Sequence, residues 1–168
     1  MIPTLQTERL IMRPFEDRDL DPLAEWFATP ASAILGGPMS RSLTWRGIAM
    51  MMGHWMIRGF GMWALEDRKT GAFVGRCGPW YPEAWPEREI GWLVLPSAEG
   101  KGYAFEAAHA ARDYAYKTLG WTTAISLIAA DNLRSQALAK RLGAVNEAPF
   151  VHPEFGDMEI WRHPGPQV

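Results

Sequence analysis

The sequence is poor in cysteine and carries no surplus of positive charge. Its single cysteine, Cys77, cannot form a disulfide within the chain, and such scarcity is typical of proteins from the reducing cytoplasm. With 17 basic and 19 acidic side chains the formal net charge is −2. This balance does not favour a nucleic-acid partner, because phosphate binding needs clustered lysine and arginine. We therefore expect a cytoplasmic protein without a nucleic-acid partner.

Long apolar runs and metal-binding motifs are also missing. Arg9 and Arg13 interrupt the first apolar run, which argues against a secretory signal peptide. The methionine-rich stretch at 47–57 contains His54 and is about half as long as a membrane-spanning helix needs to be. The four histidines form no HExxH motif, and one cysteine cannot form a CxxC motif. We expect neither a membrane partner nor a bound metal.

Strand-like and helix-like segments follow one another along the chain. Strand patterns occur at 9–13, 62–65, 72–77, 89–95, 121–128, 144–150 and 158–161. Helical spacing of apolar residues occurs at 19–28, 43–57, 103–119 and 132–142. A chain with 48% apolar residues over this length can form a core without disulfides. The order of segments predicts a single α/β domain over residues 1–168, with one mixed central sheet flanked by helices.

A short glycine-rich loop at residues 99–104, with the sequence Glu-Gly-Lys-Gly-Tyr-Ala, joins a strand to a helix. Unpaired N–H groups and the positive end of the helix dipole meet at such a loop, which makes it suitable for binding phosphate. An ordinary glycine turn is the alternative interpretation. A P-loop is excluded because Gly102 follows Lys101, and a Rossmann fingerprint is excluded because Phe105 stands where glycine or alanine is needed.

Three motifs occur together in the chain: TERLIMRP at 7–14, Ile-Gly-Trp at 90–92 ahead of the glycine loop, and DNLRSQALAKRLG at 131–143. In this order and spacing the sequence resembles the GNAT superfamily of N-acetyltransferases, and in particular the branch that acetylates the N-termini of ribosomal proteins. The resemblance extends from about residue 7 to residue 161. It implies a largely antiparallel sheet in which two neighbouring strands splay apart and hold coenzyme A.

The resemblance also implies where acetyl-coenzyme A binds. The strand at 90–95 would carry a bulge and diverge from the strand at 121–128, and the pantetheine arm would pair with its backbone in the gap. A backbone N–H near Leu93 would stabilise the thioester oxyanion. The loop N–H groups would hold the pyrophosphate. The implied cofactor-binding residues are Leu93, Val94, Leu95, Gly100, Lys101, Gly102, Tyr103, Ala104, Asn132 and Ser135.

Three positions in these motifs need separate comment. Glu99 stands where the family has arginine or glutamine, so either it turns away from the pyrophosphate or Lys101 compensates for its charge. Asn132 matches the asparagine that contacts the cofactor arm, and it also suits a helix N-cap. Ser135 matches a serine that protonates the leaving thiolate, since Ala139 stands where many relatives have a tyrosine. A structural role at the helix start is the alternative for Ser135.

The expected chemistry is direct attack of an amine within a ternary complex. Cys77 is interpreted as a small apolar residue of a buried strand, so no acetyl-enzyme is expected. The general base is Glu89 in our prediction, with Glu87, Glu154 or a water chain as alternatives. The acceptor would be a small amine or a protein N-terminus. A non-catalytic acyl-coenzyme A-binding or regulatory module of the same fold is the alternative function.

Aromatic and methionine side chains are concentrated in the first half of the chain. Trp45, Trp55, Trp63, Trp80 and Trp85 fall in this half, together with five methionines between Met50 and Met62. They are interpreted mainly as core packing plus a subunit interface, which would make the protein a homodimer. The second interpretation is an acceptor groove formed by the first two helices and the loop at 80–85.

Overall fold

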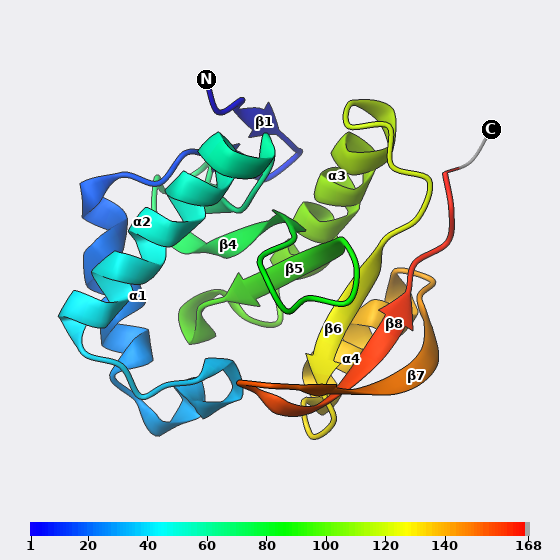
Figure 1. Ribbon diagram of the computed structural model, residues 1–168. Coiled ribbons are helices and arrows are strands. Elements are labelled where there is room, and N and C mark those ends of the chain that lie inside the picture. Colours follow the sequence, from blue (N-terminus) through cyan, green and yellow to red (C-terminus); the bar gives the residue numbers. More distant parts are fainter. Residues whose placement is uncertain (167–168) are drawn as a thin grey trace.

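The computed structural model describes residues 1–166, and its centre is a single eight-stranded sheet (Figure 1). The strands lie in the order β1-β2-β3-β4-β5-β6-β8-β7. Their bounds are β1 Leu5–Gln6, β2 Leu10–Arg13, β3 Trp63–Asp67, β4 Phe73–Trp80, β5 Glu89–Val94, β6 Ile125–Ala129, β7 Val145–His152 and β8 Gly156–Arg162. Neighbouring strands are antiparallel except for β5 and β6. The prediction of a mixed, largely antiparallel sheet is confirmed.

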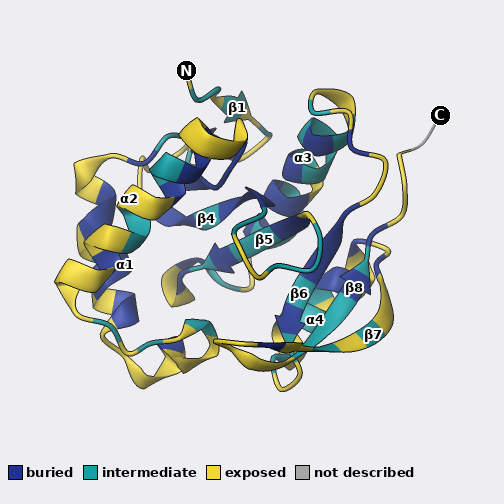
Figure 2. Cartoon of the chain, in the orientation of Figure 1, coloured by how far each residue is buried: buried dark blue, intermediate teal, exposed yellow. Residues whose placement is uncertain are grey.

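Helices cover both faces of this sheet. They are α1 Leu20–Phe27, α2 Arg41–Arg58, α3 Tyr103–Lys117 and α4 Leu133–Arg141, with short 3-10 turns at Asp17–Asp19, Pro30–Leu35 and Pro96–Ala98. One core cluster joins α3 to the sheet, and a second joins α1 and α2 to the sheet. Figure 2 shows the middle of the sheet buried and the outer sides of α1 and α2 exposed. Within residues 1–166, no helix combines the length and apolar character that a membrane span requires.

Helix α3 lies close to the sheet because its inner side carries small residues. Ala107, Ala108, Ala111 and Ala115 are all fully buried. The helix ends earlier than its apolar pattern predicts, and Trp121 follows it as a buried residue of the connecting loop, with its backbone N–H donating to the Ala115 carbonyl. For this reason the next strand, β6, begins at Ile125 and not at residue 121.

The two parallel strands β5 and β6 touch at one point and then diverge. Their only registered pair is Glu89 with Ile125, at the start of both strands. On its other side β5 pairs with β4 in unbroken register from Glu89 to Val94. The bulge expected in β5 is therefore not there, since an inserted residue would shift that register. The gap between the diverging strands opens toward the glycine loop and α4 (Figure 1).

Candidate active site

A cleft of about 250 Å³ follows the gap between β5 and β6. Three kinds of wall enclose it: strand β5, the glycine loop with the first turn of α3, and one side of α4. The lining residues include Trp92, Leu93, Val94, Glu99, Gly100, Gly102, Tyr103, Ala104, Phe105, Asn132, Arg134, Ser135, Leu138 and Arg141, with Trp26, Ile34 and Leu35 at the end near α1. The cleft thus joins the glycine loop to the residues that begin α4.

The glycine loop is held in a shape that ordinary residues rarely adopt. Gly100 and Gly102 have φ of +73° and +80°, in the left-handed region where a side chain is strained. Gly102 is the N-cap of α3, so the N–H groups of the following turn point outward without helical partners. Arg9 supports the loop from behind, donating from Nη1 to the Lys101 carbonyl at 2.6 Å and from Nε to Glu106 at 2.7 Å. The result is a preformed cradle for an anion.

Two side chains replace the strand pairing that is lost where β5 and β6 separate. The Leu127 N–H of β6 donates to Glu89 Oε2 at 2.9 Å, and Ser126 Oγ donates to the Ile90 carbonyl at 2.6 Å. Ser126 in turn lies 2.8 Å from His163 Nε2. These two side chains therefore give partners to backbone groups that would otherwise be buried and unpaired where the strands separate.

Backbone groups along β5 alternate between the two neighbouring strands. The Arg88 carbonyl accepts from β6 and the Ile90 carbonyl from Ser126, whereas the Leu95 N–H donates to Val74 on the β4 side. In unbroken register every second residue faces the same neighbour. It follows that Trp92 and Val94 direct their backbone polar groups into the gap, and Leu93 directs its own toward β4.

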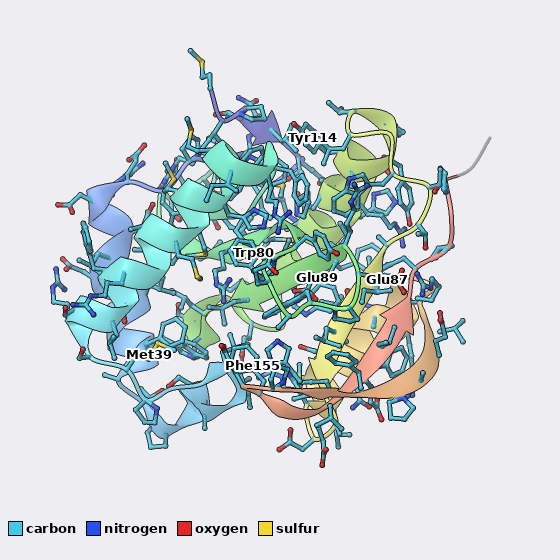
Figure 3. All side chains as sticks on the ribbon, viewed as in Figure 1. Met39, Trp80, Glu87, Glu89, Tyr114 and Phe155 are labelled. Carbon is cyan, nitrogen blue, oxygen red and sulfur yellow. The ribbon has the colours of Figure 1, made fainter. Side chains whose placement is uncertain are left out.

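The Glu89 carboxyl is buried at the vertex of the splay. It is 6% exposed, and desolvation raises its pKa to about 7 although the Leu127 N–H, Trp85 and Arg76 all act to lower it. The indole N–H of Trp85 faces this carboxyl but is buried without a partner in hydrogen-bonding geometry. Figure 3 shows Glu89 in the middle of the molecule near Trp80, its paired residue on β4. A carboxyl with this pKa can exchange protons near neutral pH.

The start of α4 brings Asn132 and Ser135 to the cleft. The Asn132 side-chain oxygen accepts from the Ser135 N–H at 3.1 Å, which makes Asn132 the N-cap. The Trp92 indole N–H donates to Ser135 Oγ at 3.2 Å. Since the indole occupies one lone pair of that oxygen, the Ser135 hydroxyl proton is free to donate to another group in the cleft.

A family model described as "Acetyltransferase (GNAT) domain" matches residues 9–145 of the chain. The chain belongs to this family of acetyltransferases. Among curated proteins it is similar to YkkB of Bacillus subtilis (strain 168), with 31% identity over 143 residues that cover 83% of each chain. It is also similar to the N-acetyltransferase YoaA of the same organism, with 26% identity over 88% of this chain and 85% of that one.

Solved structures agree with this assignment. An acetyltransferase from Agrobacterium tumefaciens str. C58 superposes with a TM-score of 0.88 at 36% identity, covering 98% of this GNAT chain and 95% of its own. A putative ribosomal-protein-serine acetyltransferase from Vibrio cholerae has a TM-score of 0.80 at 21% identity, covering 98% and 100%. The second likeness concerns the fold alone. The resemblance inferred from the three motifs is confirmed.

Enzymes of the GNAT family use acetyl-coenzyme A as co-substrate, and this acetyltransferase has residues that suit it. Most of the predicted cofactor-binding residues line the cleft, including Leu93, Val94, Gly100, Gly102, Tyr103, Ala104, Asn132 and Ser135. Leu95 is instead buried in the core beside α1 and α2, and Lys101 donates from Nζ to the Ser97 carbonyl. Among residues 1–166, no group of three or more His, Cys, Asp or Glu side chains is placed to hold a metal ion.

The expectation of an oxyanion donor near Leu93 can be made more specific for the acetyltransferase. The register of β5 directs the N–H of Leu93 itself toward β4. The N–H groups of its neighbours Trp92 and Val94 face the gap. Without the expected bulge, the alternation along β5 is set by its pairing with β4. Trp92 itself was missed as a site residue, although its place beside Leu93 was a usable signal.

The other candidate bases are engaged elsewhere. Glu87 accepts two hydrogen bonds from Arg162 at 2.7 Å, and Figure 3 shows it apart from Glu89 on the side of β8. Glu154 lies on the turn between β7 and β8, outside the cleft that holds the glycine loop. Cys77 is fully buried in β4, where burial raises the pKa of its thiol, as expected for a residue of the core. Of the three glutamates considered as the base, Glu89 is the one whose carboxyl lies at the vertex of the splay.

Proposed function

We propose that this acetyltransferase moves the acetyl group of acetyl-coenzyme A to a primary amine, either of a small molecule or of a protein N-terminus, by direct attack in a ternary complex. A single domain spanning residues 1–168 would perform the whole reaction. The observation that supports this most is the position of Glu89, a buried carboxyl with a pKa of about 7 at the vertex of the splay.

The two faces of the sheet supply different parts of the site. Glu89 lies on the face that packs against α1 and α2, the same face as its neighbours Trp80 and Leu93. Ser135 belongs to α4 and is bonded to Trp92, whose side chain points to the other face of β5. An amine approaching from the α1 and α2 side would meet Glu89, and the co-substrate would lie along the cleft that leads to the glycine loop.

Each group then has a defined task. Glu89 accepts a proton from the amine, which must be neutral to attack the thioester carbon. The N–H groups of Trp92 and Val94 stabilise the negative charge that develops on the carbonyl oxygen. As the carbon–sulfur bond breaks, Ser135 donates its hydroxyl proton to the departing sulfur and regains one from solvent. The co-substrate supplies the activated acetyl group.

The alternative, a non-catalytic module that binds acyl-coenzyme A, needs Glu89 only as the acceptor of the Leu127 N–H. That role does not require an ionisable group, because a glutamine side chain could accept the same hydrogen bond. A carboxyl at this buried position therefore favours catalysis over binding alone.

The proposal is tested by measuring thiol release from acetyl-coenzyme A against a panel of small amines and N-terminal peptides. We expect amine-dependent release in the wild-type protein and little release from the Glu89→Gln variant. Glutamine can still accept the Leu127 N–H, so the variant should stay folded and bind coenzyme A. Coenzyme A binding without turnover of any amine in the panel would support the non-catalytic module.

A further inference from the structure

The glycine loop begins with a negative charge, which is unfavourable next to a pyrophosphate. Glu99 occupies the first position of the loop and lines the cleft together with Gly100 and Gly102. A carboxylate in this cleft would repel the oxygens of a bound pyrophosphate, and the repulsion is stronger in a partly enclosed cleft than in water. If the loop binds pyrophosphate, some cation must offset Glu99.

Arg134 is that cation. Its Nη1 lies 2.8 Å from Glu99 Oε2, so that a residue of α4 reaches across the cleft to the opposite wall. The other basic residues near the loop have other partners: Lys101 donates from Nζ to the Ser97 carbonyl, Arg9 is paired with Glu106, and the Arg141 guanidinium lies over the Phe105 ring. The charge of Glu99 is therefore offset by α4 and not by the loop itself.

The guanidinium of Arg134 keeps binding capacity beyond this ion pair. It has five N–H donors in a planar fork, and one Nη is engaged with Glu99. Its side chain is 72% exposed and lines the cleft beside the glycine loop. Because an exposed ion pair is weak and a guanidinium binds phosphate in a bidentate manner, Arg134 can contact a phosphate while Glu99 holds it in place.

We propose that Arg134 binds the pyrophosphate of coenzyme A and that Glu99 is a positioning residue, which holds the guanidinium over the glycine loop. This inference rests on the proposed function, since it assumes that coenzyme A occupies the cleft. The arrangement supplies from α4 the positive charge that the family's arginine supplies from the first position of the loop. It also links the loop directly to the helix that carries Ser135, the residue following Arg134.

The test compares the binding of three ligands to folded variants by calorimetry or ligand-observed NMR. Coenzyme A carries the pyrophosphate and a 3′-phosphate, dephospho-coenzyme A keeps only the pyrophosphate, and pantetheine has neither. We expect Arg134→Ala to raise the Kd for the first two ligands by about tenfold, the scale of one partly exposed charge-assisted hydrogen bond. The Kd for pantetheine should stay within about twofold. These measurements need no acceptor and no turnover.

Lys140→Ala is the matched control. Lys140 is another exposed cation of α4, and its Nζ lies over the Trp161 ring at 5.6 Å, away from the cleft. The substitution removes the same charge from the same helix, so it reports any general electrostatic effect. We expect it to change the Kd for coenzyme A by less than about twofold, because exposed charges at a distance are screened by salt.

The role of Glu99 is tested by combining two substitutions. In the Arg134→Ala variant the Glu99 carboxylate faces the phosphates unpaired, so adding Glu99→Gln should recover part of the lost affinity. A residue that only packs the loop would not produce this recovery. The four Kd values for wild type, both single variants and the double variant form a cycle whose non-additivity measures the coupling.

Three results would overturn the inference while leaving the proposed function intact. Unchanged coenzyme A binding by Arg134→Ala would remove Arg134 from the site. An equal loss of affinity for pantetheine would mean that Arg134 acts through the packing of α4. A loss confined to coenzyme A, and absent with dephospho-coenzyme A, would assign Arg134 to the 3′-phosphate. By contrast, a wild-type protein that binds none of the three ligands would contradict the proposed function itself.

Discussion

The raised pKa of the Glu89 carboxyl results from its buried surroundings. As a glutamate at the start of a strand it would ordinarily be ionised at neutral pH, and its ordinary pKa is 4.5. Burial at the vertex of the splay raises that pKa to about 7, with one hydrogen bond from Leu127 in partial compensation. The same residue therefore links catalysis and stability, and both links can be measured.

For catalysis, ionised Glu89 is the active form, so the rate should fall as the pH drops through about 7. We expect this fall in the wild-type pH–rate profile. The Glu89→Gln variant should not show it, and its kcat should be lower by about 10²- to 10⁴-fold. A Glu89→Gln enzyme with the wild-type profile would instead indicate that a water chain serves as the base.

The effect of Glu89 on stability changes with pH in the direction opposite to that of a carboxylate in an ion pair. Because the folded pKa lies above the unfolded value, the folded protein binds the extra proton and loses stability as the pH rises from about 4.5 to about 7. The loss amounts to at most about 3 kcal/mol. Urea denaturation should show Glu89→Gln gaining stability over wild type at pH 8 and little at pH 4.5. Equal differences at both pH values would contradict the raised pKa.

Ser135 is the second residue with a measurable role. If its hydroxyl protonates the departing sulfur, Ser135→Ala should lower kcat by roughly ten- to a thousandfold, since a water can partly replace a positioned acid. The KM for acetyl-coenzyme A should change little, because this interaction forms mainly in the transition state. Steady-state kinetics under conditions where chemistry limits the rate will decide. A kcat within about twofold of wild type would leave Ser135 as the residue bonded to Asn132 and Trp92.

At the scale of elements, the junction between the glycine loop and α3 is what prepares the anion site. Its shape depends on two left-handed glycines, Gly100 and Gly102, and on Arg9, which approaches within 3.3 Å of the position a Cβ would occupy at Gly102. The motif could be recognised from the sequence because glycine is the residue that adopts this backbone freely. The role of Arg9 could not, since Arg9 comes from the connection between β1 and β2, far away in the chain.

We therefore expect Gly102→Val to weaken coenzyme A binding by about 2 kcal/mol or more, the scale of a lost charge-assisted hydrogen bond. Gly120→Val is a suitable control. Gly120 also has positive φ, +68°, and follows the opposite end of α3 with no atom within 4 Å of its would-be Cβ. Calorimetry should show normal affinity for the control, so that backbone strain is separated from the loss of the cradle. Equal affinities of the two variants would contradict the assignment of the loop.

At the scale of the whole molecule, the acetyltransferase is stabilised by a packed core without a disulfide. Its one cysteine is buried in β4, and most of the tryptophans noted in the sequence are also buried: Trp55, Trp63 and Trp80. The interpretation as core packing is confirmed for these three. Trp45, Met50, Met56 and Ile57 are exposed on α2. The homodimer stays a prediction.

The melting temperature should accordingly respond to coenzyme A but not to reductant or chelator. Coenzyme A at about 100 times its Kd should add about 2.7 kcal/mol, because only the folded chain presents the cleft. Reductant and chelator should leave the melting temperature unchanged, which thermal denaturation with each additive will show. A lower melting temperature in chelator would reveal a metal that supports the fold.

The sequence by itself determined the order of the four helices and of all strands except the two-residue β1, together with the glycine loop and the family. These properties are local: apolar spacing, proline and glycine positions, and motifs of a few residues are read directly from neighbouring positions. It also supplied Asn132 and Ser135, because both lie in one short motif at the start of a helix.

Only the tertiary structure decided which groups meet in the cleft. The partner of Glu99 lies 35 positions away, at Arg134. At the vertex of the splay, outside the lining of the cleft, the hydrogen bond to Glu89 comes from Leu127 on another strand. The direction of the Leu93 N–H depended on whether β5 carries a bulge, which is visible only in its register with β4. Burial and strand register are properties of the assembled sheet, and for this reason the pKa of Glu89, the oxyanion donors and the Arg134 contact could not be read from the chain alone.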